Sequence, residues 1–63
     1  MVIIKFGIMY YRNIYDLISS EGIEVEAGSL WRNSPNGKKL FLVDEDQFAS
    51  TALDESNFKN AGI

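Results

Sequence analysis

Apolar residues dominate the first eleven positions of the chain, which read MVIIKFGIMYY. β-Branched and aromatic residues at this density are typical of a strand. The segment is far shorter than the roughly 20 apolar residues of a membrane-spanning helix. It also has no charged start and no small-residue cleavage site, so we expect no signal peptide. The pattern predicts an N-terminal strand in a soluble, cytoplasmic protein.

Residues 14–21 place apolar side chains three and four positions apart, which is the spacing of one helical face. Asn13 is a residue type that caps helix N-termini. Gly22 stands where a left-handed residue would end the helix. We therefore predict a helix over residues 14–21.

Apolar and acidic residues alternate over residues 23–27, which is strand periodicity with one solvent-exposed face, and Gly28 then marks a bend or a bulge. The following SPNG stretch, residues 34–37, is typical of a three-residue hairpin loop with a glycine bulge. In that loop Ser34 pairs with Lys38, and the same register places Trp31 opposite Phe41. The pattern predicts a hairpin with apolar residues on both faces.

A second helix is predicted after the hairpin, with Asp44 as its cap and Gln47 at the capping-box position. Its buried side would contain Phe48, Ala49 and Ala52. Residues 54–55 either continue this helix or start a second helical turn that contains Phe58. The predicted order is strand, helix, strand, strand, helix. We therefore expect one α+β domain over residues 1–63, with an antiparallel sheet and helices packed on one face. Residues 1–12 would form an N-terminal strand extension to the region 13–63.

Composition narrows the possible chemistry. Nine acidic and six basic residues give the 63-residue chain a net charge of −3, which disfavours a general electrostatic grip on nucleic acid. The chain has no cysteine and no histidine, so it can form neither a disulfide nor a Cys/His metal site. An all-carboxylate calcium or magnesium site is the alternative left open, although the chain contains no DxDxDG-type loop. We expect no metal and no cofactor.

Four landmarks occur in order along the chain. They are the segment IYDLISSEGI, the pair Gly28 and Ser29, the turn residues 35–37, and the closing segment NFKNAGI. Together they resemble the HicA family of small mRNA-cleaving toxins, in which they correspond to the first helix, a Gly-Ser-His strand motif, a Pro-Asp/Asn-Gly turn and the last helix. The resemblance implies a double-stranded-RNA-binding-domain-like fold.

The chain departs from that family where the chemistry lies. Leu30 occupies the position of the family's catalytic histidine, and no other histidine is present. The strand before the turn is one residue shorter than the family pattern. Without the histidine, the family's general acid–base chemistry cannot operate. The resemblance therefore implies a scaffold without its catalytic residue.

Arg32, Lys38 and Lys39 gather half of the six basic residues around the hairpin tip, beside Trp31. We predict that these four residues form a binding patch for an acidic protein surface or a phosphate backbone, with the indole as an anchor. Two alternatives stand beside this prediction. Lysines next to a turn also keep a hairpin soluble, and Trp31 with Phe41 can equally form the core beneath a helix.

Two further clusters have alternative interpretations. Tyr10, Tyr11 and Tyr15 are either interface anchors or half-buried packing residues. The acidic residues at 44–46 and 54–55 are either a decoy that imitates nucleic-acid phosphates or ordinary helix-capping charges.

The sequence favours a non-enzymatic binding protein that acts on a partner protein, as an inhibitor, an antitoxin-like neutraliser or a phage-type regulator. The alternative is a toxin-like endoribonuclease or an RNA-binding module. A homodimer could form through the edge of the N-terminal strand. No membrane partner is expected.

Overall fold

The computed structural model describes residues 7–43 and 46–62, and within these ranges the chain is all β, with seven strands and no helix. The part of the chain that is described therefore contains no helix long and apolar enough to cross a membrane. The strands are β1 (Tyr10–Asn13), β2 (Leu17–Ile18), β3 (Glu24–Val25), β4 (Leu30–Asn33), β5 (Lys39–Leu42), β6 (Ser50–Ala52) and β7 (Phe58–Asn60).

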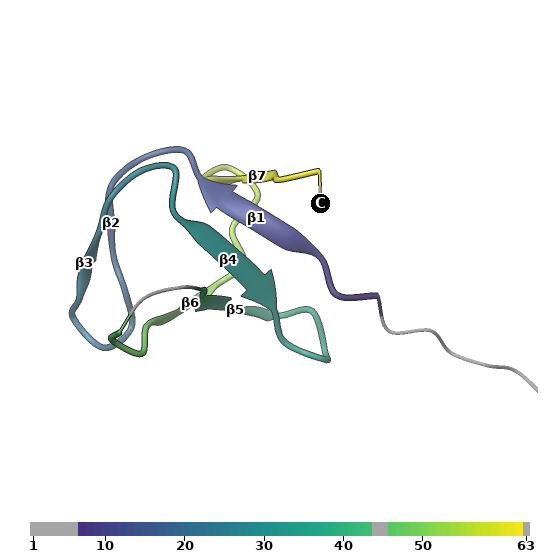
Figure 1. Cartoon of the computed structure of the whole chain (residues 1–63), viewed down its shortest axis with the longest axis horizontal. Helices are drawn as coiled ribbons and strands as arrows, with labels where there is room; N and C mark the ends of the chain where they lie inside the picture. Colours follow the sequence, from purple (N-terminus) through teal and green to yellow (C-terminus); the bar gives the residue numbers. More distant parts are fainter. Residues whose placement is uncertain (1–6, 44–45, 63) are drawn as a thin grey trace, which may run out of the picture.

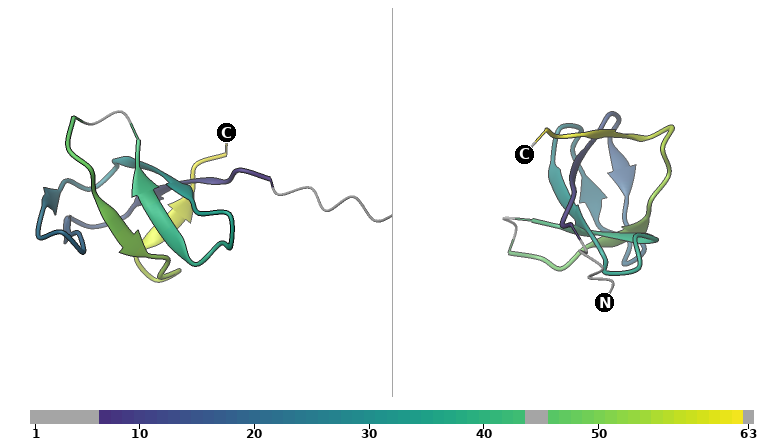
Figure 2. Two further views of the ribbon diagram at one scale, coloured as in Figure 1. Left: turned by 90° about the horizontal axis from the view of Figure 1, so that it is seen from below. Right: turned by 90° about the vertical axis from the view of Figure 1, so that its right-hand side faces the viewer.

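Five strands form one antiparallel sheet in the order β6-β5-β4-β1-β7, and β2 pairs with β3 in a separate small hairpin. Figure 1 shows β1 and β4 side by side, with the β2–β3 hairpin extending from their upper ends. Seen from the side, the strands curl around a shared interior (Figure 2). The fold is thus a small, strongly curled sheet with a hairpin between its first two long strands.

One face of each long strand supplies the core. Trp31 and Leu40 are completely buried, and the Trp31 indole meets the Phe58 ring edge to face with centroids 5.7 Å apart. Such aromatic pairs contribute about 0.5–1.5 kcal/mol beyond the area that they bury. Val25 and Ala49 complete the core from outside the three central strands.

Asn13 joins the core to the base of the β2–β3 hairpin. Its side-chain NH2 donates to the carbonyl oxygens of Tyr15 and Glu26, each at 2.9 Å. Its side-chain oxygen accepts from the Ser29 amide at 3.0 Å and from the Trp31 indole nitrogen at 3.1 Å. All four bonds of one buried amide are therefore made, and they hold together the points where the chain leaves the sheet and returns.

The tip of the β2–β3 hairpin covers the outer edge of β6. The Ser20 amide donates to the Ser50 carbonyl at 2.8 Å, and the Ser50 amide donates to a Glu21 carboxylate oxygen at 2.6 Å. The Ser50 hydroxyl donates to the other oxygen of the same carboxylate. Since an unpaired edge strand invites association with other chains, this contact protects one end of the sheet.

The predicted α+β class is wrong, because both helices are replaced by strands and turns. Within residues 14–21 the apolar spacing belongs to strand β2 and its flanking turns. Asn13 does not cap a helix, since its side chain is buried in tertiary hydrogen bonds. Gly22 is left-handed as expected, with φ of 82°, but it lies in a hairpin turn closed by Ser19.

The second helix is absent in the same way. Within the described residues of that segment, Ala49 is buried beside β6, whereas Phe48 and Ala52 are exposed. Phe58 is buried, but on strand β7. Three apolar residues in a short window can satisfy either a helical or an irregular path, and here pairing with the sheet decides. Asp44, the expected cap, lies outside the described residues.

The β4–β5 hairpin is confirmed, but its register differs by one residue. Ser34 pairs with Lys39, and Trp31 lies opposite Leu42. The Asn36 side-chain oxygen accepts from the Lys38 amide at 3.0 Å and so retains Lys38 in the loop. The loop has four residues where we predicted three, although Gly37 has the expected left-handed φ, 73°. The shift separates Trp31 from Phe41.

An all-β chain does not have the double-stranded-RNA-binding-domain-like fold that the HicA resemblance implies. The predicted N-terminal strand falls largely on residues 1–6, which lie outside the described residues. The homodimer predicted through that strand therefore stays a prediction. The first described strand begins at Tyr10.

Candidate interaction surface

Because successive side chains of a strand point to opposite sides, the sheet has an inner face and an outer face. Tyr10 pairs with Arg32, and Arg32 pairs with Phe41, so these three residues form a row across β1, β4 and β5. Directly opposed residues point to the same side of a sheet, about 5 Å apart. Because the neighbouring Trp31 and Leu40 point inward, this row lies on the outer face. Arg32 is exposed, and the two rings beside it are half-buried.

Charge is segregated between the sheet and the rest of the chain. The strands of the five-stranded sheet contain four cations, Arg12, Arg32, Lys39 and Lys59, and no acidic residue. The described acidic residues all lie in loops or in the β2–β3 hairpin: Asp16, Glu21, Glu24, Glu26, Asp46, Asp54 and Glu55. The sheet is therefore locally cationic, although the net charge of the whole chain is −3.

The cations on the sheet differ in what they contact. The Arg12 guanidinium donates to the Gly28 carbonyl at 2.8 Å, which directs it toward the bend before β4. The Arg32 side chain makes no hydrogen bond and no ion pair with any residue that the structure describes. Within the described part of the chain, its five N–H donors are therefore available to a ligand.

Three of the four predicted binding residues lie at the surface. Arg32 lies on the outer face of β4, Lys39 lies on the outer face of β5, and Lys38 lies in the hairpin loop. All three are exposed. Trp31 is 0% exposed, on the opposite face of β4. The candidate surface therefore keeps the three cations and excludes the indole, which belongs to the core.

The structure adds residues that sequence reasoning did not select. A groove of about 220 Å³ opens on the outer face. Its lining consists of Gly7, Ile8, Arg32, Asn33, Ser34, Pro35 and Phe41. Ile8 is 59% exposed, and Phe48, whose ring centroid is 5.9 Å from that of Phe41, is 65% exposed. Exposed apolar residues that adjoin one another and are rimmed by polar groups are typical of an interaction surface.

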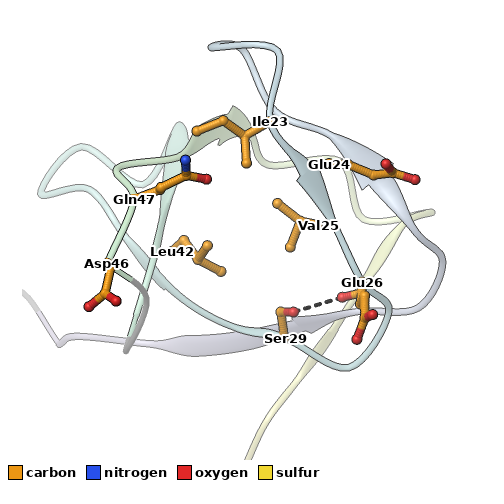
Figure 3. Close-up of a pocket in the computed structure, with 8 residues that line it drawn as sticks. All are labelled: Ile23, Glu24, Val25, Glu26, Ser29, Leu42, Asp46 and Gln47. Carbon is orange, nitrogen blue, oxygen red and sulfur yellow. Dashed lines mark hydrogen bonds between the residues drawn. The ribbon is translucent and has the colours of Figure 1, made fainter.

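A second groove, of about 330 Å³, lies between β3 and the segment that precedes β6. Figure 3 shows Val25 and Leu42 toward its centre, while the carboxylates of Glu24 and Asp46 point away from it. The acidic groups therefore do not converge on one point. Consistent with this, the described residues contain no group of three or more acidic, histidine or cysteine side chains that could hold a metal ion.

Hydrogen bonds lower the pKa of two carboxyl groups. The Ser50 hydroxyl and amide hold the pKa of Glu21 below its ordinary value of 4.5. The Ser56 hydroxyl and amide likewise lower the pKa of Asp54. A lowered pKa keeps a carboxylate ionised at neutral pH, which is the opposite of what a general acid requires. Both carboxylates therefore have structural roles: Glu21 covers the edge of β6, and Asp54 stabilises the turn that contains Ser56.

Comparison of the chain with protein-family models, with curated proteins and with solved structures gave no match.

Proposed function

We propose that this chain is a non-enzymatic binding module that acts by occupying a partner protein through the outer face of β1, β4 and β5. The observation that supports the proposal is the row Tyr10–Arg32–Phe41, in which an exposed arginine, whose side chain has no partner among the described residues, lies between two aromatic rings on a sheet whose strands contain no acidic residue. Arginine and aromatic residues are the side chains most enriched at the energetic centres of protein interfaces.

The surroundings of this row support a protein partner. Ile8 and Phe48 extend its apolar area, and the exposed Lys38 and Lys39 supply a polar rim. An apolar centre with a polar rim is the usual anatomy of an interface. Such a module would act as an inhibitor or neutraliser. The absence of cysteine fits a cytoplasmic site of action, where thiols stay reduced.

Site-specific photocrosslinking tests the proposal. A benzophenone amino acid replaces Tyr10, on the outer face, or Tyr15, which is 64% exposed but lies outside the five-stranded sheet. In cells of the source organism, we expect a discrete protein adduct from position 10 and none from position 15. Equal adducts from both positions, or none from position 10, would contradict the proposal.

RNA binding is the second candidate, because the same row interleaves rings with a cation. Sheets that bind single-stranded nucleic acid stack bases on aromatic side chains beside basic groups. Binding of this kind weakens steeply with salt, since phosphate contacts release counterions. A protein interface with an apolar centre tolerates salt much better, so a salt titration separates the two candidates.

The ribonuclease alternative has a direct test. Incubating the repurified protein with mixed mRNA, beside a Leu30→His variant, would reveal cleavage. We expect none from the natural chain, which has no histidine to act as a general base.

A further inference from the structure

The outer-face groove is built on a fixed backbone. The Asn33 amide donates to the Met9 carbonyl at 3.1 Å, and the Met9 amide donates to the Asn33 side-chain oxygen at 3.2 Å. These two bonds hold residues 7–9 beside the end of β4, so Ile8 forms one side of the groove. Phe41 from β5 and Pro35 from the hairpin loop also line it.

The charge in the described lining of the groove is positive. Arg32 is the only charged residue among the described residues of its lining, and no acidic residue occurs on any of the five strands around it. A guanidinium binds a carboxylate with two parallel hydrogen bonds, and such charge-assisted pairs are roughly twice as strong as neutral ones. The complement of this site is therefore an anionic group with two acceptor oxygens.

The size and apolar content of the groove restrict further the kind of ligand that it can bind. Its volume of about 220 Å³ is below the roughly 300–1,000 Å³ of pockets that enclose whole small molecules. It therefore suits one or two side chains of a larger partner. Ile8, Pro35 and Phe41 offer apolar contact on the same surface as the cation, which favours an aliphatic or aromatic side chain next to the anionic group.

We propose that this groove binds an extended peptide segment of the partner in which an Asp or Glu residue neighbours a large apolar residue. The carboxylate pairs with Arg32, and the apolar side chain lies against Ile8 and Phe41. This inference rests on the proposed function and specifies the partner's contact chemistry.

The probe is a synthetic peptide with a Glu-Leu-Glu-Phe centre flanked by Gly-Ser, titrated to millimolar concentration into the isotope-labelled full chain. Two matched peptides replace both glutamates by glutamine, or both apolar residues by serine. We expect chemical-shift changes confined to the groove, at residues 7–9, Arg32, Pro35 and Phe41. Both matched peptides should bind at least about tenfold more weakly, the effect of losing one charge-assisted pair or one buried side chain.

Two charge reversals locate the contact. Arg32→Glu should lower the affinity for the probe peptide roughly 10- to 100-fold. Lys59→Glu makes the same change in net charge on β7, outside the groove lining, and should leave affinity within about twofold. Equal losses from both variants, or no shift changes at the groove, would overturn the inference. Tighter, salt-sensitive binding of a single-stranded oligouridine would also overturn it.

The peptide experiment can fail without the proposed function failing. If position 10 gives a protein adduct but the peptide does not bind, only the proposed acidic–apolar peptide ligand is contradicted, and the proposed function stands. No adduct from position 10 would contradict both.

Discussion

The Trp31 indole nitrogen donates a hydrogen bond of 3.1 Å to the side-chain oxygen of Asn13, and both side chains are buried. This contact fixes which face of β4 points inward. It thereby turns Arg32, the next residue along the strand, toward solvent. The composition of the candidate surface thus follows from a polar contact in the core.

Replacing Asn13 should severely destabilise the domain. Asn13→Ala leaves the Trp31 indole N–H, the Ser29 amide and two carbonyls without their partner. Each buried unsatisfied group costs about 1–3 kcal/mol, so we expect a loss of at least about 3 kcal/mol. Domains of this size have only about 3–5 kcal/mol from their core, and the variant should be largely unfolded at 25 °C.

Urea denaturation followed by circular dichroism checks this expectation. Asn60→Ala is the matched control, because Asn60 is exposed and accepts one hydrogen bond from Gly62. The control should change the free energy of unfolding by less than about 0.5 kcal/mol. A cooperative transition of Asn13→Ala at the wild-type midpoint would contradict the buried network.

The single tryptophan reports its own environment. Trp31 is completely buried, so its emission in the folded protein should be blue-shifted and poorly quenched by iodide. Trp31→Ala should cost about 3–5 kcal/mol, the usual range for removing a large buried aromatic ring. Trp31→Phe keeps a ring against Phe58 and should cost clearly less. Red-shifted, readily quenched emission from folded protein would show that the indole lies at the surface.

Acid should weaken the contact that covers the edge of β6. The pKa of Glu21 is lowered in the folded state by Ser50, so its contribution to stability is present above pH 4.5 and is lost as pH falls through the lower folded pKa. Stability of the wild type should therefore fall below pH 4.5 more steeply than that of Glu21→Gln. Thermal melts across this range measure the difference. Glu55→Gln removes an exposed carboxyl outside this contact and should keep the wild-type slope.

Gly28 should tolerate a side chain poorly despite open space around it. Its φ of 86° is in the left-handed region, and no described atom beyond the glycine and its two chain neighbours lies within 4 Å of where a Cβ would stand. Gly28→Ala should thus cost about 1–2 kcal/mol from backbone strain alone. Gly7, equally open but without a left-handed φ, is the control, and Gly7→Ala should be near neutral. Equal midpoints for the two variants in urea would contradict this assignment.

Local backbone features could be predicted from the sequence, whereas the fold class could not. Gly22 and Gly37 were expected to be left-handed, and they are. The helices failed because the evidence for them was local: Asn13 has the chemistry of a cap, but three of its four side-chain hydrogen bonds are made to residues distant in sequence. Tertiary pairing overrides such preferences in short segments.

The candidate surface could be predicted only in part. The exposure of Arg32, Lys38 and Lys39 follows from their charge and from the turn beside them. The neighbours Tyr10 and Ile8 depend on the pairing of β1 with β4, which brings together residues about twenty positions apart. That register follows from the inward position of Trp31, and nothing in the local pattern specifies it.

The claim that the outer face binds a protein has one most direct test: the amount of partner captured from lysate by the wild type and by Arg32→Glu, before and after ribonuclease treatment. We predict that capture by the wild type survives ribonuclease and moderate salt, and that Arg32→Glu reduces it at least about tenfold, the range for losing a charge-assisted contact at an interface. Capture that disappears with ribonuclease, or that is unchanged in Arg32→Glu, would contradict the claim.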